Sequence, residues 1–320
     1  MQFKLKKIRS DASFREFFRL HKGKKTSIIV TAKKERFKNL IAYSAINKFL
    51  KTKGIYTPRL ISQHFKEGII EIEDFGDKTL LHYVKQSKNK FSLYKKCVDV
   101  ILKIQKIKPV RKIKFSSNKY LNLNSYNAAS LHKESNLFFD WYLPGVIGKK
   151  KSLKYKNSIK RELSKLYRKI YFKNKFIVHR DFHVSNIIIT KKKLGIIDTQ
   201  DVILGNPVYD LASLIDDVRV KVSSQVKRKI FQYYCAKCSV KKKQDLLKSD
   251  FEILSIQRNL KILGIFYRLF KRDNKPQYLK YLPYTWSLIE LRMKNKIFKD
   301  LKILIKKAVN KKIRKKKIFK

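Results

Sequence analysis

The alternation of apolar and polar residues near the beginning of the chain predicts a pair of antiparallel strands. Aromatic and leucine residues between positions 14 and 20 lie close to the every-second-residue spacing of a half-buried strand. Thr26 to Val30 has the composition of a return strand, and the polar segment from His21 to Lys25 supplies the turn. We therefore predict a β-hairpin within residues 3–30.

The pattern then changes to helical spacing. Apolar residues three and four positions apart predict a helix from Lys34 to Lys53, and Gly54 provides its end. Short apolar runs predict two more strands, near residues 60–64 and 68–73. Most of the chain after these strands has helical spacing.

A strand end followed by a break marks the predicted lobe boundary at Glu73–Asp77. Strands with one helix, a hinge and then mostly helices predict an α+β, two-lobed, protein-kinase-like fold. Residues 1–75 form the small lobe with an antiparallel sheet, and residues 76–320 form the larger, mostly helical lobe. Ligand sites tend to lie in clefts of such architectures.

Polar residues interrupt apolar runs at three points that together indicate phosphoryl-transfer chemistry. Asp181 and Asn186 lie in the segment His179-Arg180-Asp181-Phe182-His183-Val184-Ser185-Asn186, and Asp198 follows a predicted β-hairpin. In kinase-like folds, such an Asp accepts the proton of the attacking hydroxyl, while the Asn and the second Asp hold metal ions. The alternative is that these residues cap turns and end a strand.

Charge adds to the argument. The chain has 79 Lys and Arg against 24 Asp and Glu, which gives a net charge of +55. Residues 181–217 nevertheless contain six aspartates, roughly twice the acid density of the whole chain. A local cluster of aspartates in a basic chain indicates a partner cation or a structural role. Lysines are spread along the chain, so we expect non-specific polyanion binding at low salt and no specific nucleic-acid site.

Composition also indicates a folded cytoplasmic protein. Hydrophobic residues make up 43% of the chain, and lysines interrupt every apolar run before it reaches the length of a membrane span. No apolar region of the secretory-signal type follows the basic N-terminus. The three cysteines give no disulfide framework, which fits a reducing compartment. The C-terminal segment from Lys306 to Lys320 has nine basic residues, and we expect it to be a frayed, solvated helix end, with a polyanion contact as the alternative.

With these motifs, the sequence resembles the aminoglycoside phosphotransferase and choline kinase superfamily. Within it, the sequence is most similar to bacterial kinases that phosphorylate N-acetylmuramate and N-acetylglucosamine at the anomeric position in cell-wall recycling. The resemblance covers most of the chain and rests on the segments Ser10–Arg15, Pro58–Leu60, Ile72–Asp77, Asp140–Tyr142, His179–Asn186, Ile197–Asp201, Gly205–Leu211 and Gln257–Phe266.

The resemblance implies ATP and Mg²⁺ as cofactors, Asp181 as the catalytic base, and Asn186 and Asp198 as metal ligands. It also implies nucleotide contacts at Ser10, Asp11, Ala12, Ser13, Lys33 and Glu73. The chain departs from the wider pattern in two respects. It has no glycine-rich phosphate loop, and the strand at residues 28–31 lacks the usual lysine, for which Lys33 or Lys34 is a candidate.

The acceptor is less clearly indicated. Glu134 and Asp140 follow the hinge, where this superfamily builds its substrate pocket, and Arg258 lies on a later helix. Arg180 and His183 flank the catalytic base, so they are candidates for contact with phosphate or substrate. Arg258 would suit a carboxylate such as the lactyl group of N-acetylmuramate.

These observations predict an ATP-dependent small-molecule kinase that phosphorylates the anomeric hydroxyl of an amino sugar. One alternative is a phosphotransferase for an aminoglycoside or a choline-type alcohol. A second is a polyanion-binding, non-enzymatic protein on a kinase-like scaffold. The presence of all three polar site residues argues against the second alternative. The sequence does not indicate the oligomeric state.

Overall fold

The structure is a computed structural model that describes residues 3–8, 15–33, 37–191, 193–240 and 243–315. The chain forms two compact units. The first unit combines residues 1–125 with 176–204, and the second combines residues 126–175 with 205–320. The predicted lobe boundary after residue 75 falls inside the first unit, so the division into two lobes there stays a prediction.

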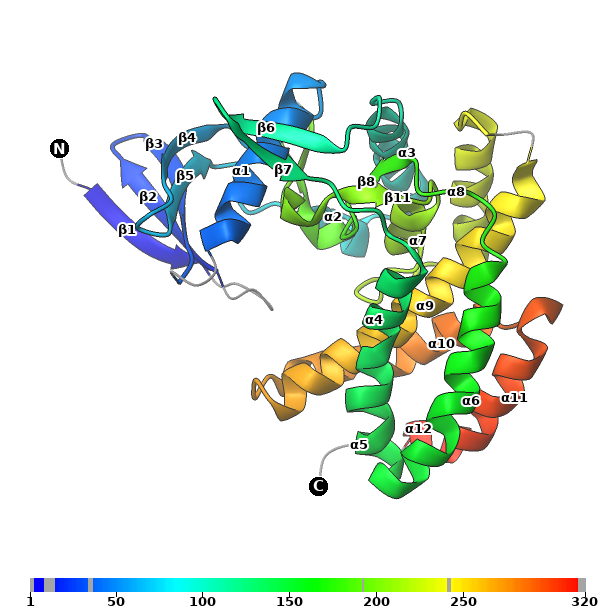
Figure 1. Ribbon diagram of the computed structural model, residues 1–320. Coiled ribbons are helices and arrows are strands. Elements are labelled where there is room, and N and C mark those ends of the chain that lie inside the picture. Colours follow the sequence, from blue (N-terminus) through cyan, green and yellow to red (C-terminus); the bar gives the residue numbers. More distant parts are fainter. Residues whose placement is uncertain (1–2, 9–14, 34–36, 192, 241–242, 316–320) are drawn as a thin grey trace. The chain divides into compact units, whose positions relative to one another are not determined.

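A five-stranded antiparallel sheet opens the first unit, in the order β1-β2-β3-β5-β4 (Figure 1). Its strands are β1 (Phe3–Ile8), β2 (Glu16–Lys22), β3 (Lys25–Thr31), β4 (Leu60–His64) and β5 (Ile69–Glu73). The predicted hairpin is confirmed for β2 and β3, which pair Leu20 with Ser27. The prediction of a hairpin alone was incomplete, because β1 pairs with the other edge of β2.

Helix α1 (Phe37–Thr52) lies within the range predicted for it. Leu40 and Tyr43 of this helix join Val30 and Ile70 of the sheet in one buried apolar cluster. The backbone leaves the helix at Gly54, whose φ of +77° favours glycine because other side chains rarely adopt this conformation. The apolar periodicity and the glycine stop therefore placed this helix correctly.

The rest of the first unit surrounds the predicted catalytic segment. It contains α2 (Leu80–Gln86), α3 (Lys90–Gln105), β6 (Lys112–Ser116), β7 (Lys119–Asn122), β8 (Phe176–Val178), the short 3-10 helix η3 (Val184–Asn186), β9 (Ile187–Ile189), β10 (Leu194–Ile196), the 3-10 helix η4 (Thr199–Asp201) and β11 (Ile203–Gly205). The predicted hairpin before Asp198 is confirmed as the antiparallel pair β9–β10. Gly195 in β10 admits the ring of Phe75, because a Cβ there would lie 2.5 Å from a ring carbon.

The second unit is helical, as the sequence predicted. Its elements are α4 (Ala128–Leu137), the π-helical turn η2 (Phe138–Tyr142), α5 (Leu143–Ile147), α6 (Lys149–Arg168), α7 (Tyr209–Ile215), α8 (Ser224–Lys237), α9 (Gln244–Lys271), η6 (Pro276–Tyr281), α10 (Leu282–Arg292), η7 (Lys296–Phe298), α11 (Lys299–Ala308) and α12 (Lys311–Lys315). The long helix α9 contacts α4, η2, α7 and α10. At Gly264 the backbone of Leu137 approaches so closely that a Cβ would lie 2.2 Å from its carbonyl carbon.

The C-terminal segment is only partly the solvated end that the sequence predicted. The Arg314 side chain is 8% exposed and donates a hydrogen bond of 2.5 Å from Nη1 to Glu290. Its guanidinium lies 4.0 Å from the centre of the Trp286 ring. Stacking on an aromatic face can bury an arginine that would otherwise stay in water, so Arg314 is packed, although Lys306, Lys307, Lys311 and Lys312 of the same segment are exposed.

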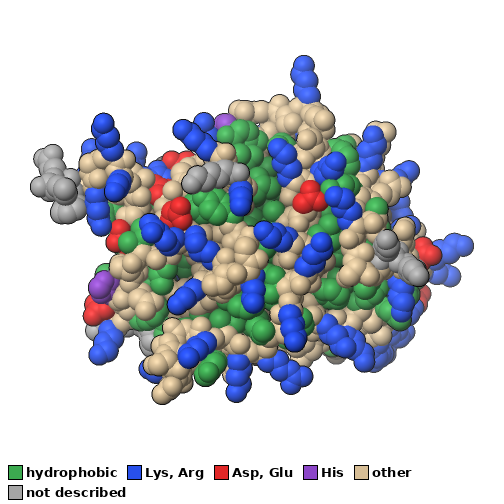
Figure 2. All heavy atoms as spheres, turned by 90° about the horizontal axis from the view of Figure 1, so that it is seen from above, with side chains coloured by type: hydrophobic (Ala, Val, Ile, Leu, Met, Phe, Trp, Pro, Cys, Tyr) green, Lys and Arg blue, Asp and Glu red, His purple; other side chains and the backbone are tan. Residues whose placement is uncertain are grey.

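The basic side chains are widely distributed. Figure 2 shows Lys and Arg side chains spread over the visible face, with hydrophobic and acidic side chains between them. This agrees with the even spacing of lysines in the sequence. Among the helices that the structure describes, none combines the length and apolar character needed to cross a membrane.

Candidate functional site

The loop after β8 is fixed by its first residue. His179 is fully buried, and its Nε2 lies 3.0 Å from the carbonyl oxygen of Ile197, to which it donates. Its ring also packs edge-on against the buried ring of Phe182. Arg180 then adopts a left-handed conformation with φ of +75°, which an L-residue adopts only where its surroundings impose it. The buried histidine therefore ties the loop that carries Asp181 to the chain just before Asp198.

Asn186 joins the other two site residues. Its side-chain Nδ2 donates to the carbonyl oxygen of Asp181 at 3.1 Å and lies 3.4 Å from Nε2 of His183. The backbone carbonyl oxygen of Asn186 accepts a hydrogen bond from the backbone N–H of Ile197 at 3.1 Å. The structure thus brings Asp181, Asn186 and the residue next to Asp198 into one local arrangement.

Asp198 ends its segment in a left-handed conformation, with φ of +65° and ψ of +44°. The guanidinium of Arg15 donates from Nη2 to Oδ1 of this aspartate. The following residue, Thr199, is fully buried and donates to Oδ1 of Asn47 on α1 at 3.4 Å. Thr199 is therefore a buried residue that connects the start of η4 with α1.

A chain of polar contacts links Arg15 with Arg180. Nη1 of Arg15 donates to Oε1 of Gln200 at 3.0 Å, and Nε2 of Gln200 donates to Asp201 at 3.0 Å. Nη1 of Arg180 also lies 3.3 Å from Asp201. The segment before β2 is thereby connected, through η4, to the loop that carries Asp181.

The donor atoms fit a hard divalent cation. Because Asn186 turns its Nδ2 towards Asp181, its Oδ1 faces the other way. Arg15 contacts Oδ1 of Asp198, and no hydrogen bond from a described residue reaches Oδ2 of Asp198 or Oδ1 of Asn186. Mg²⁺ is bound in proteins through one or two such oxygens, with water and phosphate completing its octahedron. No cluster of three or more His, Cys, Asp or Glu suited to a metal occurs among the described residues.

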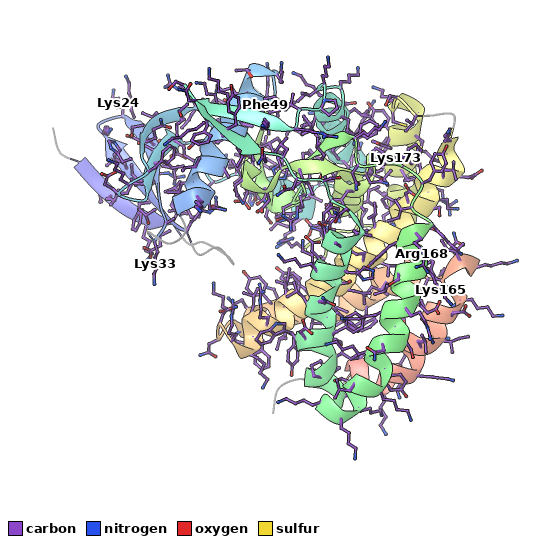
Figure 3. The ribbon with its side chains drawn as sticks, viewed as in Figure 1. Lys24, Lys33, Phe49, Lys165, Arg168 and Lys173 are labelled. Atoms are coloured by element: carbon purple, nitrogen blue, oxygen red, sulfur yellow. The ribbon has the colours of Figure 1, made fainter. Side chains whose placement is uncertain are left out.

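The residues predicted to contact nucleotide are only partly visible. Ser10, Asp11, Ala12 and Ser13, and with them Lys34, lie outside the described residues. Lys33 is exposed just after β3, and Figure 3 shows it at the opposite end of the sheet from Lys24. The carboxylate of Glu73 accepts the backbone N–H of Arg59 at 3.0 Å, and Lys51 lies 3.8 Å from it.

Among the predicted acceptor residues, Glu134 lies in a buried network of the second unit. Its carboxylate accepts hydrogen bonds from the Tyr126 hydroxyl, from Lys261 Nζ at 2.9 Å and from Gln257 Nε2 at 3.3 Å. Burial, together with Tyr209 and Glu134, raises the pKa of Tyr126 well above its ordinary value, so this hydroxyl stays a donor. The network gives Glu134 a structural role between α4 and α9, and its contact with substrate stays a prediction.

The other predicted acceptor residues differ in burial. Asp140 is half exposed and pairs with Lys156 at 3.1 Å. His183 is buried beside Asn186 in the first unit. Arg258 is 5% exposed on α9, and its Nη1 has no hydrogen-bond partner among the described residues. A buried donor without a partner is costly, which makes Arg258 the most informative of the three.

A cavity of about 370 Å³ lies in the second unit between α6 and the segment from η7 to α11. Figure 3 labels Lys165 and Arg168, two of the α6 residues that line it. None of the residues predicted from the sequence to contact nucleotide or acceptor lines this cavity.

Two contributors to the site were not recognised in the sequence. Arg15 belongs to the segment on which the resemblance rests, but no role was assigned to it, and Gln200 was not considered. The absence of the usual lysine from residues 28–31 could have pointed to Arg15, because a positive charge absent from one strand can be supplied by a residue next to another strand. Arg15 is 183 positions from Asp198, so local spacing gave no hint of the pair.

Together, the antiparallel sheet, the helical remainder and the loops around Asp181 and Asp198 are typical of kinase-like phosphotransferases. A family model described as the phosphotransferase enzyme family matches residues 4–244. This is most of the chain, which therefore belongs to this family. The predicted fold class and the prediction of a phosphotransferase enzyme are confirmed.

Two relatives show which members of the family this chain is similar to. The chain is 27% identical over 287 residues to an N-acetylmuramate/N-acetylglucosamine kinase of Pseudomonas aeruginosa, with 88% of this chain and 81% of the relative covered. A protein of the same description from Pseudomonas putida is 27% identical over 285 residues, with 88% and 80% covered. The resemblance to this branch of the superfamily is confirmed.

Solved structures show the same fold. A choline/ethanolamine kinase family protein from Mesorhizobium loti superposes with a TM-score of 0.60 at 11% identity, with 95% of this chain and 92% of that protein covered. At this level of identity the similarity concerns the fold alone.

Proposed function

We propose that this protein is an ATP-dependent kinase that phosphorylates an amino sugar, N-acetylmuramate or N-acetylglucosamine, at its anomeric hydroxyl. The proposal rests above all on the arrangement of Asp181, Asn186 and Asp198 in one loop cluster of the first unit. The description of the two Pseudomonas relatives supports the choice of acceptor. A role in cell-wall recycling and a cytoplasmic location follow as part of the proposal.

Asp181 is the proposed general base. It would orient the attacking hydroxyl and accept its proton, which is a contribution of roughly 10²- to 10⁴-fold in rate. An anomeric hydroxyl is more acidic than an ordinary alcohol, so one carboxylate is a sufficient base. His179 would keep the Asp181 loop in place through its hydrogen bond to Ile197.

Asn186 and Asp198 are the proposed Mg²⁺ ligands, through the two side-chain oxygens that no described residue occupies. When bound, the cation would neutralise charge on the transferring phosphate. Ser10–Ser13, Lys33 and Glu73 remain the proposed nucleotide contacts, and Glu134, Asp140, Arg180 and His183 remain candidates for acceptor or phosphate contact.

Arg258 is the proposed contact for an acidic acceptor. Its Nη1 is buried without a described partner, and the lactyl carboxylate of N-acetylmuramate would provide one. The Arg258→Gln variant should then lose kcat/KM for N-acetylmuramate while retaining most of it for N-acetylglucosamine, which has no carboxylate. Equal losses for both sugars would remove Arg258 from the acceptor site.

The decisive experiment incubates the protein with Mg-ATP and each sugar and follows the product by phosphorus and proton NMR. A phosphate coupled to the C1 proton is the expected result. Choline and an aminoglycoside are tested in parallel, because turnover of either without sugar phosphorylation would favour the alternative acceptor class. Absence of transfer to any of them, with polyanion binding retained, would favour a non-enzymatic scaffold.

A further inference from the structure

Arg15 lies where a site of this kind needs a positive charge. In protein kinases, a lysine from the third strand of the sheet contacts the nucleotide phosphates. The corresponding strand here, β3, has a lysine only at its first residue, Lys25; its second half is Ile28-Ile29-Val30-Thr31, and the next lysine is Lys33, beyond the strand. Arg15 comes from the segment just before the neighbouring strand β2, yet its guanidinium reaches Asp198.

The surroundings of Arg15 fix its side chain in this position. It is 5% exposed, and its two terminal nitrogens are divided between Asp198 and Gln200. Its guanidinium carbon lies 5.4 Å from the centre of the Phe17 ring and 5.9 Å from that of Tyr43. Aromatic faces attract a guanidinium and leave its edge available for planar hydrogen bonding.

Asp198 cannot serve both Arg15 and a divalent cation equally well. In this structure Arg15 neutralises the aspartate, which is 30% exposed. A cation at Oδ2 would take over that role and would also repel the guanidinium, since both carry positive charge. The phosphate groups that accompany the cation are strong acceptors of charge-assisted hydrogen bonds from arginine.

We propose that Arg15 replaces the strand lysine: it pairs with Asp198 when no nucleotide is bound, and it contacts the nucleotide phosphates when the metal–nucleotide complex binds. This inference rests on the proposed function, because it takes Asp198 as a metal ligand of an ATP-dependent kinase. It assigns Arg15 a contact with the nucleotide phosphates and does not depend on which acceptor is phosphorylated.

The inference predicts effects of opposite sign for the Arg15→Gln variant. Affinity for Mg-ADP should fall about 10- to 100-fold, because a charge-assisted hydrogen bond to phosphate is lost. Affinity for Mn²⁺ alone should instead rise several-fold, because the competing guanidinium is gone. Calorimetry measures the first, and water-proton relaxation measures the second. A purely structural role for Arg15 would weaken both.

Two further variants isolate the charge. Arg15→Lys retains the positive charge but loses the planar guanidinium that can donate two parallel hydrogen bonds. The Mg-ADP affinity of this variant should therefore lie between those of the wild type and Arg15→Gln. Lys7→Gln is the matched control. It also removes one positive charge from this sheet, but Lys7 pairs with Glu16 at the exposed surface, so both affinities should stay at wild-type values.

A measurement on the wild-type protein covers the case in which Arg15→Gln does not fold. Arginine-selective NMR detects each guanidinium, and the Arg15 signal is assigned by its absence from Arg15→Lys. Addition of Mg-ADP should shift this signal more than addition of Mg²⁺ alone. An unchanged signal, or equal Mg-ADP affinity in Arg15→Gln and wild type, overturns the inference. Failure of the wild type to bind Mg-ADP would instead refute the proposed function.

Discussion

Two aspartates from the same acidic stretch of this basic chain lie in opposite environments. Asp198 in the first unit is 30% exposed and receives one ion pair, from Arg15. Asp216 in the second unit is 1% exposed and receives Lys227 at 2.8 Å, Arg292 through two bonds of 2.8 Å and the Ser255 hydroxyl at 2.6 Å. One aspartate retains an oxygen for a ligand, and the other has none to offer.

The difference shows what makes an acidic residue available for chemistry. Burial alone would raise the pKa of Asp216, but the charges and hydrogen bonds of Lys227 and Arg292 outweigh burial and hold it well below its ordinary value. Its charge is therefore used to connect α7 with α8, α9 and α10. Asp198 is fixed by backbone conformation and by one arginine, so a cation can still approach it.

The largest expected effect is on turnover, and it comes from Asp181, the other proposed catalytic aspartate of the first unit. Asp181→Asn should lower kcat by roughly 10²- to 10⁴-fold, because the amide cannot accept the proton of the attacking hydroxyl. Affinity for Mg-ADP should stay near the wild-type value, since Asp181 acts on the acceptor. Steady-state kinetics and calorimetry on the same preparation measure both. A variant that kept more than half of the wild-type kcat would exclude Asp181 as the base.

The second prediction compares stability. Asp216→Asn should lower the free energy of unfolding by about 3–5 kcal/mol, because Lys227 and Arg292 are left buried without a counter-charge. Asp198→Asn should cost less, since it breaks one ion pair rather than two and Asp198 itself is 30% exposed, but it should abolish metal-dependent nucleotide binding. Urea unfolding and calorimetry give the two readouts. If the two variants lost equal stability, the contrast between a structural and a functional aspartate would fail.

Sequence patterns predicted the elements whose signals are local. The apolar run at Ile187–Ile189 and the basic turn after it gave the β9–β10 hairpin, and Gly54 gave the end of α1. The β6–β7 hairpin was not predicted, although lysines alternate with apolar residues in Lys112–Ser116 as they do in a half-buried strand. Strand β1 lies within the segment predicted as a hairpin but was not recognised as a separate strand.

The candidate site was predictable where its residues are close in sequence. Asp181, Asn186 and Asp198 are separated by a loop and one hairpin, so their spacing carries information. The Arg15–Asp198 pair and the burial of Arg314 depend on chain segments that meet only in the folded protein. The different fates of Asp198 and Asp216 also depend on distant partners, which composition and spacing do not reveal.

The third prediction uses the lowered pKa of Asp216. A carboxylate in the unfolded chain titrates near pH 4, so below that pH the unfolded state binds protons that folded Asp216 does not. The stabilisation from Asp216 is therefore complete above about pH 5 and is lost as the pH falls below about 4. Urea midpoints should show the gap between wild type and Asp216→Asn narrowing over this range. A gap that widened as the pH fell would contradict the charge network.

The smallest expected effect concerns the basic C-terminal segment, in which Arg314 has packing partners. Deletion of residues 316–320 removes three lysines, and if each contacts phosphate on a nucleic acid, the salt slope of binding should flatten by up to about 3. Arg314→Gln removes a charge that already pairs with Glu290 and stacks on Trp286. It should lower stability by about 1 kcal/mol and leave the slope unchanged. Fluorescence titrations of a DNA duplex at several salt concentrations measure the slopes, and urea unfolding measures the stability. A slope that changed more for Arg314→Gln than for the deletion would show that packed arginines, rather than terminal lysines, bind polyanions.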